Sequence, residues 1–207
     1  MSENFKNQEE ILSKLQIEKL NPMQEAAYKS ISSNSEIILL SPTGTGKTLA
    51  FLLPIINVLN PTIQNIQVLI LVPSRELAIQ IEQVIREMGS GYKANAVYGG
   101  RSGSKDRIEI KHPPAILVGT PGRIADHIER EAFEIQDIKT LVLDEFDKSL
   151  EVGFEEDMKF ILEELKSVTK KVLTSATQKV KIPSFVGLKA PKRLSYLGEK
   201  IPNLKLK

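Results

Sequence analysis

Residues Ser41 to Thr48 read Ser-Pro-Thr-Gly-Thr-Gly-Lys-Thr, and the rest of the chain is organised around this stretch. An apolar, β-branched run over Glu36 to Leu40 precedes it and an apolar helical pattern over Leu49 to Leu53 follows it, which predicts strand, loop, helix. Two glycines let the loop turn tightly with its N–H groups aimed inward, and the helix N-terminus adds partial positive charge. The stretch therefore predicts a loop that binds a polyphosphate.

The side chains of this loop are suited to a nucleotide. Lys47 is predicted to reach the β and γ phosphates, and the Thr48 hydroxyl is predicted to ligate Mg²⁺. The phosphates would be cradled by Thr43, Gly44, Thr45 and Gly46. The usual pattern begins with glycine, where this chain has Ser41. A plain connecting turn is the alternative, and the lysine, the hydroxyl and the flanking elements together speak against it.

Composition limits the classes of function. At 207 residues and 41% hydrophobic residues, the chain is long enough for one well-filled core, so one domain is expected. A net charge of +2 is too small to predict nucleic-acid binding, which must then depend on local groups. The chain has no cysteine, no basic-then-apolar leader and no apolar stretch near the roughly 20 residues that span a bilayer. We expect a monomeric cytoplasmic protein that does not enter the membrane.

The N-terminal residues 1–35 are expected to form two helices. Apolar residues recur at mainly helical spacing from Asn7 to Leu20, and Asn21-Pro22 then breaks the run. The second helix, which is expected to begin near Pro22, carries Gln24. The amide of this glutamine has donors and an acceptor, so it could read the edge of a base.

Further buried runs predict a parallel sheet. Near-continuous apolar stretches, typical of strands buried on both faces, occur at Gln67–Val72, Ala115–Val118, Thr140–Leu143 and Lys171–Thr174. Helical patterns alternate with them, at Arg75–Met88, Pro121–Glu129 and Glu155–Leu165. Such alternation with right-handed crossovers predicts an α/β fold, with a mostly parallel central sheet and helices on both faces.

Polar signatures follow the predicted strands. They occupy Ser41–Thr48, Pro73–Ala78, Gly119–Arg123, Asp144–Asp147 and Ser175–Thr177. In a parallel sheet a ligand binds beyond the carboxyl ends of the strands. We therefore expect the chemistry to gather at one edge of the sheet.

Asp144 and Glu145 end one of the buried strands. Asp144 is suited to hold Mg²⁺, and Glu145 is suited to orient and deprotonate the water that attacks a γ phosphate. An exposed acidic turn is the alternative reading, and the neighbouring polyphosphate loop weakens it. His112 and His127 lie outside every motif and are expected at the surface.

Seven segments in this order resemble the first RecA-like domain of DEAD-box RNA helicases. The resemblance covers nearly the whole chain and is carried by Gln24, Ser41–Thr48, Pro73–Ala78, Gly99-Gly100, Thr120–Arg123, Asp144–Asp147 and Ser175–Thr177. It implies that residues 1–207 form a single RecA-like P-loop domain that binds ATP and Mg²⁺. Within it, residues 1–35 would be the N-terminal helices that read adenine.

The resemblance also implies roles for individual residues. Gln24 would recognise adenine, Lys47 and Thr48 would hold the phosphates and Mg²⁺, and Asp144 and Glu145 would be the metal and water-activating carboxylates. Asp147 would form a hydrogen-bonded pair with the segment of Ser175 and Thr177. That pair would couple the state of the nucleotide to RNA.

Three further elements match the RNA-binding side of that family. They consist of Pro73, Arg75, Gly99, Gly100, Thr120, Gly122 and Arg123. Glycines let a sugar-phosphate backbone approach, while arginine, hydroxyl and helix N-terminal N–H groups bond phosphates without reading bases. We expect sequence-independent binding that weakens with salt. For Arg75 and Arg123 a structural salt bridge stays open as an alternative.

The chain departs from the family pattern in the acidic motif and in its N-terminal region. Phe146 stands where the family name implies alanine, which predicts altered packing rather than lost hydrolysis. Gln16-Ile17 and Leu20-Asn21 replace a Gly-aromatic pair and Pro-Thr, and an aromatic that stacks on adenine normally lies farther upstream than Phe5. These N-terminal changes lie in the region that recognises adenine in the family, so adenine selectivity is the role that they put in doubt.

A second RecA-like domain, with its arginine finger, should follow Ile201-Pro202-Asn203 in that family, and the chain stops near there. We therefore expect nucleotide binding with little or no unwinding by this chain alone. The alternative to a helicase domain is a nucleotide-gated RNA clamp or assembly platform. Intact Lys47, Asp144 and Glu145 favour the enzyme. A DNA translocase or a P-loop kinase is a third reading, which the Gln24 helix and the Thr120–Arg123 segment oppose.

Overall fold

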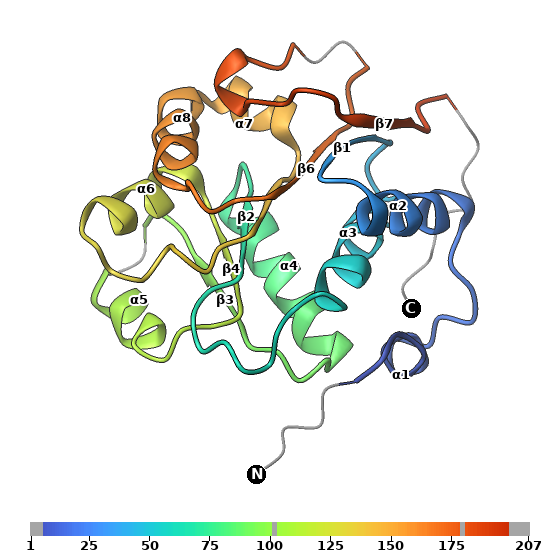
Figure 1. The fold of residues 1–207 in the computed structure, drawn as a ribbon, viewed down its shortest axis with the longest axis horizontal. Helices are drawn as coiled ribbons and strands as arrows, with labels where there is room; N and C mark the ends of the chain where they lie inside the picture. Colours follow the sequence, from blue (N-terminus) through green and yellow to red (C-terminus); the bar gives the residue numbers. More distant parts are fainter. Residues whose placement is uncertain (1–5, 101–102, 179–180, 199–207) are drawn as a thin grey trace.

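The computed structural model describes residues 6–100, 103–178 and 181–198. In these residues seven strands form one sheet in the order β3-β4-β2-β5-β6-β1-β7, and every neighbouring pair is parallel (Figure 1). The strands are β1 (Glu36–Leu40), β2 (Val68–Leu71), β3 (Ala94–Val97), β4 (Ile116–Gly119), β5 (Thr140–Leu143), β6 (Lys170–Ser175) and β7 (Lys192–Ser195). The predicted parallel sheet is confirmed. Phe5 and Ile201-Pro202-Asn203 lie outside the described residues.

Eight α-helices and one 3-10 helix accompany the sheet in the described parts of the chain. They are α1 (Gln8–Lys14), α2 (Pro22–Ser33), α3 (Lys47–Ile56), α4 (Arg75–Met88), α5 (Gly103–Ile110), α6 (Pro121–Glu129), α7 (Phe146–Val152), α8 (Glu155–Glu164) and η1 (Ser184–Val186). The first helix ends earlier than predicted, because the chain reverses at Gln16, which has a left-handed φ of 57°. None of these helices is long and apolar enough to cross a membrane.

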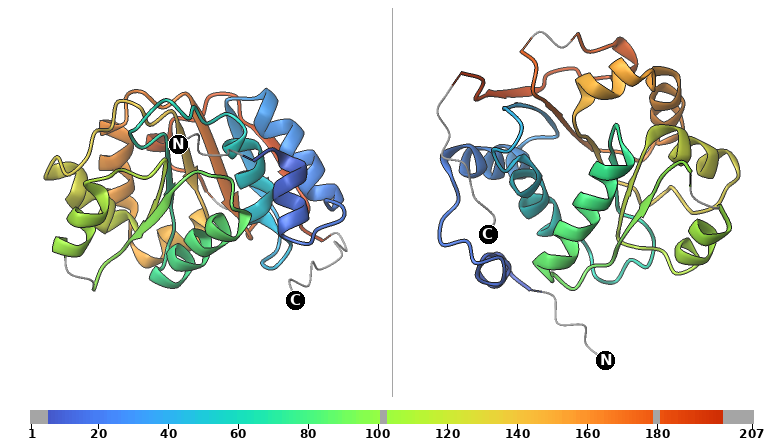
Figure 2. Two further views of the ribbon diagram at one scale, coloured as in Figure 1. Left: turned by 90° about the horizontal axis from the view of Figure 1, so that it is seen from below. Right: turned by 180° about the vertical axis from the view of Figure 1, so that it is seen from behind.

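Alternation along the strands creates two separate cores. In β1, Ile37 and Leu39 contribute to one core while Ile38 and Leu40 contribute to the other, because successive side chains point to opposite faces. The first core receives buried residues from α1 to α4, and the second receives them from α5 to α8. In Figures 1 and 2, α1, α2 and α3 accordingly lie together on one side and α6, α7 and α8 on the other. Helices on both faces are thus confirmed.

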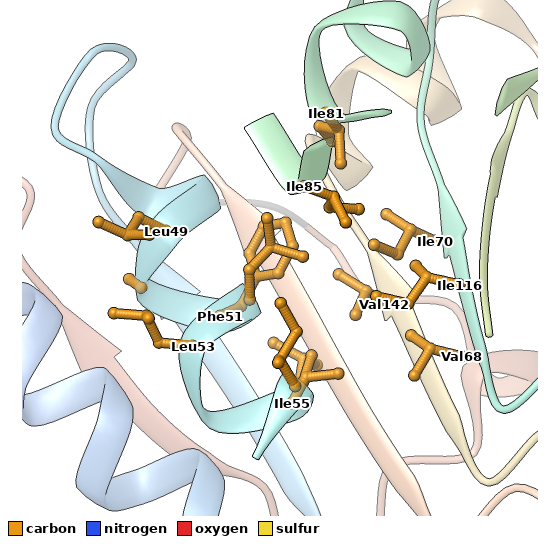
Figure 3. Close-up of a cluster of buried hydrophobic side chains, with 14 of the residues drawn as sticks. Leu49, Phe51, Leu53, Ile55, Val68, Ile70, Ile81, Ile85, Ile116 and Val142 are labelled. Atoms are coloured by element: carbon orange, nitrogen blue, oxygen red, sulfur yellow. The ribbon is translucent and has the colours of Figure 1, made fainter. Parts of the chain in front are cut away.

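Helix α3 is buried almost all round, as a helix in the middle of a core should be. Its residues Phe51 and Ile55 pack toward Val142 of β5 and toward Ile81 and Ile85 of α4 (Figure 3). This packing fixes where α3 begins. The loop before α3 is therefore attached to a helix that the first core holds in place.

Five elements were not predicted: β3, α5, α7, η1 and β7. The two strands are short, and β7 reads Lys-Arg-Leu-Ser and lies exposed at the sheet edge, so neither has the apolar run that marked the central strands. Glu36 of β1 holds the segment that leads into β7. Its carboxylate Oε2 accepts hydrogen bonds from the backbone N–H groups of Lys189 at 2.8 Å and Ala190 at 2.9 Å.

Removal of this carboxylate should loosen β7. The N–H of Ala190, and then that of Lys189, lower the pKa of Glu36 against the opposing effect of burial. A lowered pKa means that the ionised group stabilises the fold above the unfolded value and that this stabilisation is lost as pH falls through the folded value. Hydrogen exchange at 192–195 should therefore be faster in Glu36→Ala at neutral pH, and wild type should approach the variant in acid. The exposed Glu25→Ala is the control, and equal exchange at neutral pH would contradict the prediction.

Candidate active site

The loop between β1 and α3 forms an anion cradle. Gly44 and Gly46 have left-handed φ values of 80° and 85°, and Gly46 is the N-cap of α3 without a side-chain capping bond. The first N–H groups of α3 therefore have no side-chain acceptor at the cap, which is the arrangement that binds phosphate at helix N-termini. A side chain at either position would be strained at these angles.

Ser41, which stands where the usual loop pattern has glycine, takes part in hydrogen bonds within the loop. Its hydroxyl shares a 2.7 Å hydrogen bond with the Thr45 hydroxyl, and Thr45 Oγ1 also lies 2.8 Å from the carbonyl oxygen of Pro42, to which it can donate. Ser41 is fully buried. Where glycine would give the loop conformational freedom, the serine side chain adds a hydrogen bond within the loop.

Lys47 lies at the mouth of the cradle. Its ammonium donates to the carbonyl oxygens of Ser41 and, at 3.0 Å, of Pro42. Burial lowers the pKa of Lys47, while the charges of Asp144 and Glu145 oppose this change. Lys47, Asp144 and Glu145 line the same cavity, so the lysine places a positive charge where a phosphate would need one.

Asp144 and Glu145 follow β5 and face the same loop. Burial raises the pKa of Asp144 to about 6, and a hydrogen bond from Thr174 acts in the opposite direction. Glu145 has φ 48° and ψ 49°, a left-handed conformation that is uncommon for a residue other than glycine. Lys148 donates to Glu145 Oε2 at 2.9 Å. Sequence reasoning did not identify Thr174 as part of the site.

A cavity of about 250 Å³ joins these groups. Its lining includes Gln24, Thr43, Gly44, Gly46, Lys47, Thr48, Asp144 and Glu145. The cavity also has apolar lining from Leu15, Ile17, Leu49, Leu77 and Val84. The α4 residues of this wall were not predicted, because their contact with the loop arises only from packing between helices.

Gln24 is fully buried beside the loop rather than solvated. Its Oε1 accepts the N–H of Asn21 at 3.0 Å, and its Nε2 donates to the carbonyl oxygen of Gly46 at 3.3 Å. The Asn21 side chain donates to the carbonyl oxygen of Thr45 at 3.0 Å. The start of α2 is thus bonded directly to the phosphate loop, by the residue that replaces threonine of the family pattern.

The predicted coupling residues are in contact. Thr177 Oγ1 donates to Asp147 Oδ2 at 2.6 Å, and Ser175 Oγ accepts the N–H of Thr177 at 3.0 Å. Asp147 lies in the first turn of α7, two residues after Glu145 of the acidic pair. A hydrogen-bonded link therefore runs from the end of β6 to the acidic segment.

Sheet order separates the two predicted surfaces. β5, β6 and β1 are neighbours, so the acidic segment, the Ser175–Thr177 segment and the phosphate loop meet at their carboxyl ends. β3, β4 and β2 are also neighbours, so Gly99-Gly100, Thr120 and Pro73 meet on the other half of the same edge. The elements that were predicted to bind nucleotide and RNA thus lie side by side.

The two arginines of the RNA group differ in environment. Arg75, at the start of α4, is exposed and makes only a 3.4 Å contact with exposed Glu76, which is too weak to hold it. Arg123 is mostly buried, and its Nε donates to Asp106 Oδ2 of α5 at 2.7 Å. The salt bridges that were open alternatives are therefore present for both arginines, but the Arg75–Glu76 pair is exposed and weak, so Arg75 remains accessible to a phosphate.

His127 is buried, contrary to the prediction that it lies at the surface. Its Nε2 is 3.0 Å from Asp106 Oδ2, the same carboxylate oxygen that Arg123 contacts. The reason is that His127 lies on the face of α6 that packs toward α5, and α5 was not apparent from the sequence. The cluster of Asp106, Arg123 and His127 joins the two helices that follow Gly99-Gly100 and Thr120.

Comparison with known proteins agrees with this geometry. A family model described as DEAD/DEAH box helicase matches residues 21–184. The chain is 37% identical over 168 residues to the DEAD-box ATP-dependent RNA helicase CshA of Bacillus licheniformis, covering 80% of this chain and 34% of that protein. It is 41% identical over 162 residues to the ATP-dependent RNA helicase CshA of Limosilactobacillus reuteri, covering 77% and 33%. The chain thus spans about a third of the length of these relatives.

Solved structures give the same result for the fold. A DEAD box protein from the hyperthermophile Methanococcus jannaschii superposes with a TM-score of 0.81 at 29% identity, covering 94% of this chain and 55% of that one. A hypothetical ATP-dependent RNA helicase from Sulfolobus tokodaii superposes with a TM-score of 0.80 at 25% identity, covering 91% and 57%. The predicted RecA-like fold is confirmed, and the chain belongs to the DEAD/DEAH box helicase family.

Proposed function

We propose that this chain is the ATP-binding first domain of an ATP-dependent RNA helicase. The observation that carries the proposal is that one cavity is lined by the phosphate loop, by Gln24 and by the carboxylates Asp144 and Glu145. A loop that only bound nucleotide would not need a water-activating carboxylate at its edge. The family membership and the names of the relatives support the same activity.

The residues fit ATP with Mg²⁺. The uncapped N-terminus of α3 and Lys47 would bind the phosphates, and Thr48 and Asp144 supply the oxygen ligands that a hard cation prefers. Mg²⁺ there would neutralise charge that develops on the phosphates. Glu145 would accept the proton of the attacking water.

The apolar part of the cavity would receive the adenine. Leu15, Ile17 and Leu77 line this part of the cavity and would contact the base in place of a stacking aromatic. Gln24 uses one acceptor position and one N–H in the contacts described above, which leaves a lone pair and an N–H for the base. ATP should therefore be preferred over GTP.

RNA would bind across the ends of β3, β4 and β2. Exposed Arg75, the backbone at Gly99-Gly100 and the N-termini of α4 and α6 would contact phosphates without reading bases. We propose that unwinding needs a second RecA-like domain that completes the cleft and supplies an arginine. The domain by itself is proposed to be monomeric and cytoplasmic.

The proposal is tested by nucleotide titration. Replacement of Lys47 by alanine should weaken binding of Mg²⁺·ATP roughly 10- to 100-fold, because hydrogen bonds to charged groups contribute about 1.5–3 kcal/mol. Affinities are measured by fluorescence of a labelled ATP and by competition with unlabelled ATP and GTP. Lys139→Ala, a lysine outside the cavity, is the control.

Two outcomes would contradict the assignment. Equal affinity of Lys47→Ala and wild type would remove the phosphate role of the lysine, and equal competition by ATP and GTP would remove the adenine role of Gln24. Binding of single-stranded RNA should also weaken as salt rises. Nucleotide-dependent RNA binding that never accelerates hydrolysis would favour the clamp or platform.

A further inference from the structure

Thr174 lies in the sheet next to the acidic pair and belongs to none of the motifs that were recognised in the sequence. It is the next-to-last residue of β6, and β6 pairs with β5, which Asp144 and Glu145 follow. The side chain is fully buried. A buried hydroxyl in a central strand needs hydrogen-bond partners, so what it bonds to is informative.

The Thr174 hydroxyl makes two hydrogen bonds, both to the acidic pair. Its Oγ1 donates to Asp144 Oδ1 and accepts the backbone N–H of Glu145 at 3.0 Å. A hydroxyl has one hydrogen and two lone pairs, so the two bonds are compatible. One side chain therefore orients the Asp144 carboxylate and the Glu145 backbone together.

The backbone that Thr174 holds is in an unfavourable conformation. Glu145 has a left-handed φ of 48°, which L-residues adopt rarely and which persists only where the surroundings impose it. On the other side of Glu145, the fully buried ring of Phe146 anchors the start of α7 in the second core. The turn between β5 and α7 is thus held by the Phe146 ring and by the Thr174 hydroxyl.

We propose that Thr174 is a positioning residue, which presets Asp144 and Glu145 for Mg²⁺·ATP before the nucleotide binds. This inference rests on the proposed function of the site. It also extends the coupling link, because Thr174 precedes Ser175 directly and Thr177 bonds to Asp147. Strand β6 and the residues directly after it thereby hold the acidic segment at both ends, and a shift of β6 would move Asp144 and Glu145 together.

The test compares Thr174→Val, which keeps the shape and removes the hydroxyl, with Thr174→Ser, which keeps the hydroxyl. The control is Thr140→Val, a buried threonine at the other end of β5. Residues that orient a metal ligand typically change metal affinity about 10- to 100-fold when replaced. Mg²⁺ should raise the ATP affinity of wild type, and we expect this increase to be about 10- to 100-fold smaller in Thr174→Val. The ATP affinity of Thr174→Val in EDTA should stay within about twofold of wild type. Thr174→Ser and Thr140→Val should retain the Mg²⁺-dependent increase.

A second measurement needs no nucleotide. In the ligand-free protein, hydrogen exchange of the Glu145 N–H should be about tenfold or more faster in Thr174→Val than in wild type, relative to the N–H groups of β5. Thr174→Ser should restore the slow exchange. This arm remains informative if wild type binds no ATP, a result that would overturn the proposed function but not the positioning contact.

Three results would overturn the inference. The first is that Thr174→Val shows the same Mg²⁺-dependent increase in ATP affinity as wild type, or the same rate of hydrogen exchange at the Glu145 N–H. The second is Thr174→Ser behaving like Thr174→Val, which would assign the effect to the methyl group. The third is Thr174→Val with faster exchange throughout β5 and weaker ATP binding in EDTA, which would show a general loss of stability.

Discussion

Replacement of Phe146 by alanine is expected to lower the free energy of unfolding by about 3–5 kcal/mol, the usual range for removing a fully buried phenylalanine. The change would restore the alanine that the family name implies, yet it should harm this chain. The ring is fully buried at the start of α7 and packs in the core shared with α6 and α8. The cost combines lost burial with the cavity that the ring would leave.

The measurement is urea unfolding followed by circular dichroism, with the slope of each transition compared between variants. Phe133→Ala is the matched control, because Phe133 is only partly buried against the same core and should cost less. A loss below about 1 kcal/mol for Phe146→Ala would contradict the prediction, since a core site cannot give up a ring at so small a cost.

Replacement of Glu145 by glutamine is expected to slow ATP hydrolysis by at least about a hundredfold, because general bases contribute roughly 10²–10⁴-fold. Glutamine keeps the size of the side chain and loses its capacity to accept a proton. Asp144, Lys47 and the loop remain, so affinity for Mg²⁺·ATP should stay close to wild type. A loss of rate without a loss of binding distinguishes a general base from a phosphate ligand.

Hydrolysis is measured under single-turnover conditions, with the domain in excess over radiolabelled ATP and with single-stranded RNA present. These conditions resolve slow reactions, which matters because an arginine finger, which we propose that a second domain supplies, contributes a factor of about 10³ or more. Glu151→Gln, an exposed carboxylate on the same helix, is the control. A Glu145→Gln domain that hydrolyses ATP at the wild-type rate would remove Glu145 from the reaction.

Both predictions concern neighbours in one short segment, and their contrast explains the departure from the family pattern. Phe146 points into the second core, while Glu145 lines the cavity on the carboxyl edge of the sheet. Phe146 thus contributes to the core, while its neighbour Glu145 faces the cavity. A different residue at 146 can change the core without removing the proposed general base Glu145, which agrees with the expectation of altered packing.

The sequence by itself determined the fold class and the placement of the chemistry. Central strands such as Val68–Leu71 and Thr140–Leu143 are buried on both faces, so each is a continuous apolar run that is visible in isolation. Once such strands alternate with helices, their carboxyl ends must share one edge. The sequence alone therefore places the phosphate loop and the acidic pair at the same edge of the sheet.

Only the tertiary structure decided which side chains meet. Thr174 contacts Asp144 across 30 positions of sequence, and His127 contacts Asp106 across 21. These contacts depend on strand order and on helix packing, which no local pattern encodes. The physical reason is that a buried hydroxyl, imidazole or carboxylate must find a partner, and the sheet order determines which partner lies within reach. The pairing of β5 with β6 brings Thr174 to Asp144, and the pairing of β3 with β4 brings the helices of Asp106 and His127 together.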